Sequence, residues 1–117
     1  MTENGRRDLR DETSHEGAPD PDTVFSLLSN SRRRHLLYLL AEDGTPQPVE
    51  LLATRIADME ATETDTEDVY LSLVHAHLPK LETHQVVSCD GETVEPRSAM
   101  ADVEPFLDVV QNYELDA

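Results

Sequence analysis

A change in the spacing of apolar residues near residue 85 limits what this chain can fold into more than any other feature. Over residues 24–81 the apolar side chains recur at intervals of three and four, which is the spacing of one face of an α-helix. Residues 86–95 instead alternate around Asp90-Gly91, which is typical of two short strands and a two-residue turn. Helical spacing then returns over 103–113. The sequence therefore predicts a mainly α fold with a small β-hairpin and an additional C-terminal helix.

Capping and helix-breaking residues divide the helical part into segments. A short helical turn around residues 24–28 precedes a helix of roughly 31–42, which ends at Asp43-Gly44. Two prolines hold the next few residues extended, and a second helix follows over 49–59. Its apolar stripe ends at Met59.

The third helix is predicted to run from about residue 65 to Thr83. Thr64 with Glu67 three residues later forms a capping-box pattern that opens it. Pro79 lies inside, so we expect the helix to bend there or the freed carbonyl to find another partner. The predicted apolar stripe of this helix is Tyr70, Leu73, Val74, Leu78 and Leu81.

The ends of the chain differ from this folded part. Residues 1–22 hold few apolar side chains among many charges, so they cannot offset the entropy of ordering. We expect a disordered acidic N-terminal arm over 1–22 and one domain over 23–117. In the C-terminal helix, Asp102 is a plausible N-cap, and Pro105 would then lie in the first turn.

The charge balance indicates a protein that works at a high salt concentration. The chain has 25 acidic residues against 9 basic ones, a formal net charge of -16. Such a domain repels itself in dilute buffer, whereas at about 1 M salt the Debye length falls to about 3 Å. Eight of the nine basic residues are arginines, and the single lysine is Lys80. We interpret the chain as a cytoplasmic protein of a halophile; an ordinary acidic interaction protein is the alternative.

Other compartments and chemistries find little support in the sequence. No apolar run is long enough to cross a bilayer, and the lone Cys89 cannot form an internal disulfide. His75 and His77 lie about 200° apart on a helix, so they cannot chelate one ion from the same face. We find no catalytic triad and no glycine-rich phosphate loop. We therefore expect neither an enzyme nor a bound metal or cofactor.

The order of helices followed by a hairpin is that of a winged helix-turn-helix, and short motifs agree with it. The segment LATRIA at 52–57 resembles the positioning helix of ArsR-like transcriptional regulators, and HLPKLETHQVV at 77–87 resembles their junction of recognition helix and wing. The LSNSRRR start at 28–34, together with HAHLPKLE at 75–82, is similar to a haloarchaeal winged-helix domain family of unknown function. In these regulators a glycine usually takes the left-handed turn where this chain has Gln85.

The resemblance implies a recognition helix at about 65–83 and a wing at 86–95. The arginine run could contact phosphates or form structural salt bridges, and the polar helix face could enter a major groove or be merely solvated. Acidic residues at the start of the third helix and at the wing tip oppose DNA binding in dilute salt. The candidate DNA-binding residues are Arg32, Arg33, Arg34, Ser72, His75, Ala76 and Lys80.

The C-terminal helix carries an apolar stripe that needs a covering surface. A second copy could cover it and form a homodimer, or the helix could fold back on the first helix of its own domain. The stripe consists of Val103, Phe106, Leu107, Val110 and Tyr113.

Together these features favour a dimeric, sequence-specific regulator of transcription that binds double-stranded DNA in a halophilic archaeon. The alternative is a winged-helix module that binds another protein through its acidic surface and does not bind DNA.

Overall fold

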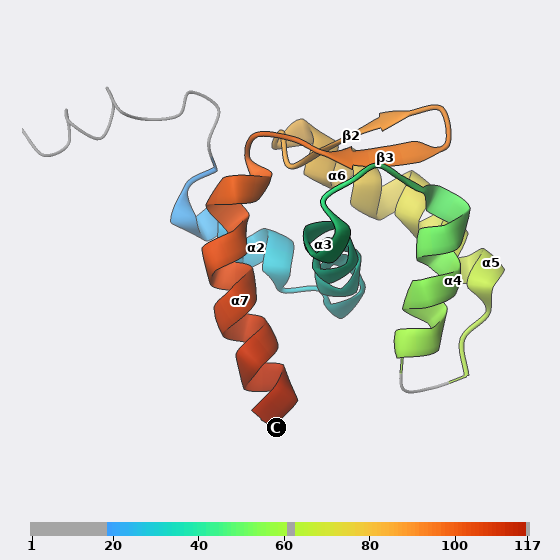
Figure 1. The fold of residues 1–117 in the computed structure, drawn as a ribbon, viewed down its shortest axis with the longest axis horizontal. Helices are drawn as coiled ribbons and strands as arrows, with labels where there is room; N and C mark the ends of the chain where they lie inside the picture. Colours follow the sequence, from blue (N-terminus) through green and yellow to red (C-terminus); the bar gives the residue numbers. More distant parts are fainter. Residues whose placement is uncertain (1–18, 61–62, 117) are drawn as a thin grey trace, which may run out of the picture.

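The computed structural model describes residues 19–60 and 63–116. Most of these residues are helical, and the predicted hairpin and C-terminal helix are present. The hairpin belongs to a small three-stranded antiparallel sheet, and the arrangement is compatible with a winged helix-like fold (Figure 1). The elements are α2 (Pro21–Leu28), α3 (Ser31–Asp43), β1 (Gln47–Pro48), α4 (Val49–Met59), α5 (Thr66–Ser72), the π-helical segment η1 (Leu73–His77), α6 (Leu78–Thr83), β2 (Val87–Asp90), β3 (Thr93–Pro96) and α7 (Met100–Asp116).

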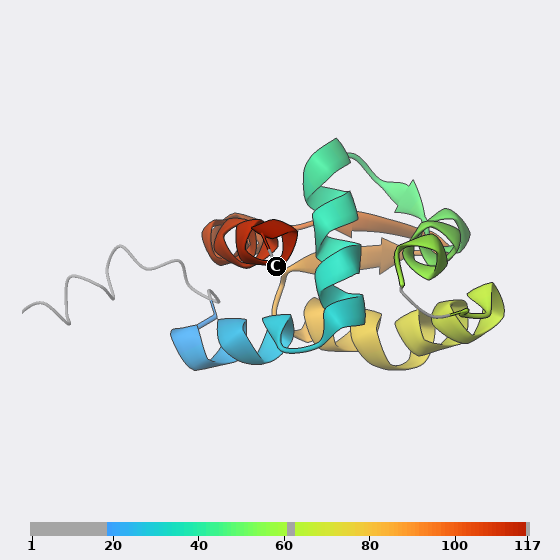
Figure 2. The ribbon, with the colours of Figure 1, turned by 90° about the horizontal axis from the view of Figure 1, so that it is seen from below.

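Helix α3 is the centre of the domain. Five consecutive side chains, from Leu36 to Leu40, are buried, so this helix is covered on all sides rather than along one stripe. Figure 2 shows α3 passing between α7 on one side and α4 on the other. Asn30 caps its start by accepting from the Arg33 amide, and Gly44 ends it in the left-handed conformation, as predicted.

The hairpin forms one residue out of the predicted register. Asp90 pairs with Thr93, so the two-residue turn is Gly91-Glu92 and not Asp90-Gly91. Gly91 takes a positive φ of 66°, which a glycine adopts without steric cost. Sequence reasoning also missed the third strand: β1 is two residues long and pairs with β3, in the order β1-β3-β2. Alternation cannot reveal a strand this short.

The predicted third helix is one continuous run of α5, η1 and α6, but its start and its middle differ from expectation. Asp65, and not Thr64, caps it by accepting from the Glu67 amide. The irregularity expected at Pro79 takes the form of η1, in which the Leu78 amide donates to the carbonyl five residues back. The π-helical turn shifts the register of the helix, as such bulges do.

Details of three predicted helices differ in the structure. Val74 is exposed, whereas Val69, outside the predicted stripe, is fully buried. Met59 at the end of α4 is also exposed. In α7 the helix begins at Met100, so Asp102 is not its N-cap, and Pro105 lies inside the helix rather than in its first turn.

Helix α7 packs against α2 and α3 of its own domain. Val103 and Leu107, two residues of the predicted dimer stripe, are buried in the domain's core. Phe106 and Tyr113 remain exposed. At the other end, α2 begins at Pro21 with Asp20 as its N-cap, so this helix starts inside the predicted arm of residues 1–22. Residues 1–18 of that arm lie outside the described residues.

Gln85 adopts a φ of 65°, in the left-handed region of backbone conformation. This region favours glycine, because the Cβ atom of any other residue is sterically strained there. We predict that Gln85→Gly raises the free energy of unfolding by about 1 kcal/mol, measured by urea denaturation in molar salt. Gln85→Ala is the control and should not stabilise, because it keeps the Cβ atom. A glycine variant no more stable than the alanine variant would contradict the strain.

Candidate nucleic-acid interface

Arg32, the first arginine of the run in α3, is held by two neighbouring helices. Its Nε and Nη2 donate to the two carboxylate oxygens of Glu60 at 2.7 and 2.8 Å, and its Nη1 donates to Ser72 Oγ at 2.9 Å. Both members of the ion pair are largely buried. Hydrogen bonding to Arg32 lowers the pKa of Glu60. The guanidinium thus joins the start of α3 to the end of α4 and to α5.

Arg33 turns toward α2. Its Nε donates to the Leu27 carbonyl at 2.9 Å and its Nη2 to the Ser26 carbonyl at 3.0 Å. Its Nη1 lies 3.3 Å from His77 Nδ1. Both carbonyls belong to the last turn of α2. The Ser26 carbonyl also accepts from the amide and the hydroxyl of Ser29, and a cation at this end of the helix interacts favourably with its terminal carbonyls.

Arg34 completes the set by joining α2 and α7 to α3. It donates to the Leu28 carbonyl at 2.7 Å and to Glu114 of α7 at 3.0 Å. The other oxygen of Glu114 accepts from the Tyr38 hydroxyl. Burial and this hydrogen bond raise the pKa of Tyr38 to about 12.

The three arginines therefore act within the domain. Successive residues fan out by about 100°, and each direction meets a different set of acceptors. Ser72, another predicted DNA contact, is also engaged: it accepts from Arg32 and donates to the Val69 carbonyl. The structure brings these four predicted residues into a structural network and not onto an open face.

The remaining predicted residues, His75, Ala76 and Lys80, are exposed along η1 and α6. The hairpin lies against this helix through contacts of β2 with α6 (Figure 1). Sequence reasoning missed two exposed apolar residues, Leu71 and Val74, that precede them on the same helix. The π-helical register places Val74 outside, and no spacing rule would have indicated it.

The charge of this surface is mainly negative. Glu67 and Asp68 are exposed in the first turn of α5, and Glu92 is exposed in the hairpin turn. Outside the arginine run, the described part of the chain has only three lysine or arginine residues: Arg55, Lys80 and Arg97. Arg97 is exposed directly after β3 and was not among the predicted contacts. A basic residue next to the wing is the signal that could have found it.

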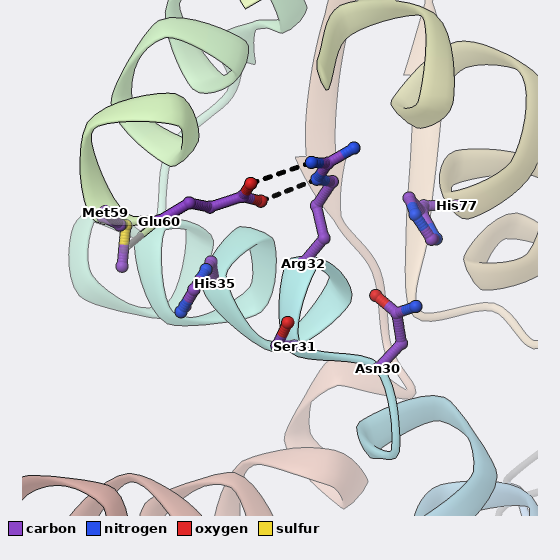
Figure 3. A pocket seen from close by; sticks show the side chains of 7 residues that line it. All are labelled: Asn30, Ser31, Arg32, His35, Met59, Glu60 and His77. Atoms are coloured by element: carbon purple, nitrogen blue, oxygen red, sulfur yellow. Dashed lines mark hydrogen bonds and ion pairs between the residues drawn. The ribbon is translucent and has the colours of Figure 1, made fainter. Parts of the chain in front are cut away.

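A pocket of about 590 Å³ opens beside the arginine network (Figure 3). Arg32 and Glu60 form their ion pair in its wall, and His35 and His77 are among the other lining residues. Burial lowers the pKa of both histidines, and the nearby Arg33 and Arg32 charges lower that of His77 further. Within residues 19–60 and 63–116, no cluster of three or more histidine, cysteine or acidic side chains is placed to hold a metal ion.

A family model described as a domain of unknown function, DUF7344, matches residues 25–95, more than half of the chain. The chain belongs to this family. The match runs from within α2 into β3, and thus includes the three arginines but not α7, which holds Glu114.

Neither a curated protein nor a solved structure matches this DUF7344 chain. The resemblance to ArsR-like regulators and to a haloarchaeal winged-helix family stays a prediction. Among the described helices, none is both long and apolar enough to cross a membrane.

The lowered histidine pKa values predict acid sensitivity. Above a pH of about 6.5 the imidazoles are neutral in both folded and unfolded chains; below it the unfolded chain takes up protons that folded His35 and His77 resist, so stability falls. We predict that the melting temperature drops between about pH 7 and pH 5.5, and that His77→Gln reduces the drop. Circular dichroism melts in molar salt measure both.

His75→Gln is the matched control, because it removes an exposed imidazole from the same helix. This variant should melt with the pH dependence of the wild type. A His77→Gln protein with an unchanged pH dependence would show that the buried imidazole does not govern acid stability.

Proposed function

We propose that this DUF7344 domain is a winged-helix regulator of transcription that binds double-stranded DNA through η1 and α6. The observation that supports this most is the exposed row of His75, Ala76 and Lys80 on a helix that lies against a β-hairpin. A helix of this kind fits a major groove, and a hairpin beside it can reach the adjacent backbone. The other predicted contacts, the three arginines and Ser72, shape the domain and do not enter this proposal as DNA ligands.

The chemistry of the row suits base edges better than phosphates. An imidazole can donate to or accept from a base edge, and a small alanine side chain can contact a thymine methyl group. The exposed Leu71 and Val74 extend the apolar part of the row. Lys80 is the one lysine or arginine in this helix, and it can reach a phosphate.

The negative charge of the surface is consistent with this proposal in the cytoplasm of a halophile. Each phosphate contact gains free energy by releasing counterions, and that gain shrinks as the salt concentration rises. In molar salt, basic residues therefore contribute less, and repulsion from Glu67 and Asp68 is screened within about 3 Å. Recognition would depend on base contacts and on shape complementarity.

A second candidate function has an observation of its own. The three arginines are engaged inside the domain, and the start of α5 presents exposed acidic side chains. This arrangement favours a module that binds a basic surface of another protein and leaves DNA alone.

Retention of genomic fragments by the tagged protein in about 2 M KCl distinguishes the two functions. A regulator enriches discrete sites. We predict that Lys80→Ala weakens binding to all of these sites by a similar factor, whereas His75→Ala mainly relaxes the preference among them.

Arg55→Ala is the control, because Arg55 lies on α4 with Glu42 at 3.8 Å and outside the proposed row. It should retain DNA as the wild type does. Fragments without discrete sites would reject the DNA assignment and favour the protein-binding module. Discrete sites that the Lys80, His75 and Arg55 variants retain equally would reject the row of η1 and α6 as the DNA-binding surface.

A further inference from the structure

The described part of the chain leaves one continuous apolar surface open on α2 and α7. Phe25 of α2 is 55% exposed and meets Phe106 of α7 edge-on, with ring centroids 5.6 Å apart. On α7, Val109 is 68% exposed, Tyr113 is 76% exposed, and Val110 is half-buried. We call these five residues the α2–α7 face. It differs from the predicted dimer stripe, because Val103 and Leu107 are buried in the core and Phe25 and Val109 are added.

The α7 residues of this face share one side of the helix. At about 100° per residue, Phe106 and Tyr113 lie within about 20° of each other, with Val109 and Val110 on either side of the line between them. The charged residues of this stretch lie elsewhere. Asp108 is about 150° from the centre of the face, and Glu114 turns toward α3 to meet Arg34 and Tyr38.

The face is rigid before any partner arrives. Glu114 fastens the end of α7 to α3, and Val103 and Leu107 anchor its first half in the core. A surface fixed in this way loses little conformational entropy on association. Figures 1 and 2 show α2 and α7 at one end of the domain, opposite α4 and α5.

We propose that a second copy of this chain covers the α2–α7 face, with the two α7 helices antiparallel. The order along the face is aromatic, valine, valine, aromatic, which reads the same in both directions. A two-fold axis through Val109-Val110 therefore places Phe106 of each copy opposite Tyr113 of the other. Such a self-complementary contact is what a two-fold dimer requires.

The exposed area supports this occupant. Taking about 200 Å² for a whole aromatic side chain and somewhat less for valine, the exposed fractions leave roughly 450 Å² of apolar surface on each copy. A standard interface buries about 800 Å² per partner, a little over half of it apolar. The face therefore matches the apolar share of a complete interface. No charged side chain of residues 106–113 enters its centre; Asp102 flanks the face about one turn before Phe106.

Light scattering in about 2 M KCl at tens of micromolar protein tests the dimer. The wild type should have the mass of a dimer, and Val109→Glu, which places a charge on each side of the axis, should weaken association about tenfold or more. Leu115→Glu is the matched control: Leu115 is 77% exposed on the same helix but points to its other side, so this variant should stay dimeric. A monomeric wild type, or a Val109→Glu variant that associates as tightly as the wild type across a dilution series, would overturn the proposal.

A cross-linking experiment tests the antiparallel geometry separately. In a Cys89→Ser background, Val109→Cys should form a disulfide between copies under mild oxidation, because the two residues meet near the axis. Leu115→Cys should not. Cross-linking through Leu115→Cys but not through Val109→Cys would refute the arrangement. The dimer does not rest on DNA binding, so loss of DNA retention and loss of the dimer are independent results.

Discussion

Three consecutive guanidinium groups at the start of α3 connect nearly every helix of this domain. Arg32 reaches α4 and α5, Arg33 reaches α2 and His77 of η1, and Arg34 reaches α2 and α7. Arginine suits this role because its planar fork offers five donors in fixed directions, while lysine offers a single ammonium. The start of the central helix thereby fixes the positions of the others, including the α7 surface and the exposed helix beside the hairpin.

This network gives the three arginines a structural role in the domain. In an acidic chain, a run of three arginines is the obvious candidate for phosphate contacts, yet here it donates to helix-end carbonyls, to the half-buried carboxylate of Glu60 and to the exposed carboxylate of Glu114. Leaving such acceptors unsatisfied inside a domain costs about 1–3 kcal/mol each. The arginines therefore stabilise the fold, and the DNA binding that we propose rests on the sparsely charged row of η1 and α6.

Much of the fold could be predicted from the sequence because it depends on local spacing and caps. The helices, the hairpin and the end of α3 at Gly44 follow from such signals, whereas the left-handed turn at Gln85 is indicated only by the resemblance to regulators that have a glycine there. The rest depends on residues far apart in the chain: Arg34 meets Glu114 eighty residues later, and Arg33 meets His77. The π-helical turn places Val74 at the surface. Contacts between distant residues likewise hold Arg32, Arg33, Arg34 and Ser72 in the arginine network, while His75, Ala76 and Lys80 stay exposed on η1 and α6.

The unfolding free energy of Arg33→Lys tests most directly whether the arginines are structural. Lysine keeps the positive charge that a phosphate contact would use but replaces the two nitrogens that donate to the Ser26 and Leu27 carbonyls with a single ammonium. If the network holds the domain, this variant should unfold with about 1–3 kcal/mol less free energy in molar salt, with the retention of DNA by the folded protein unchanged. Unaltered stability with weakened DNA retention would contradict the account and return Arg33 to the DNA interface.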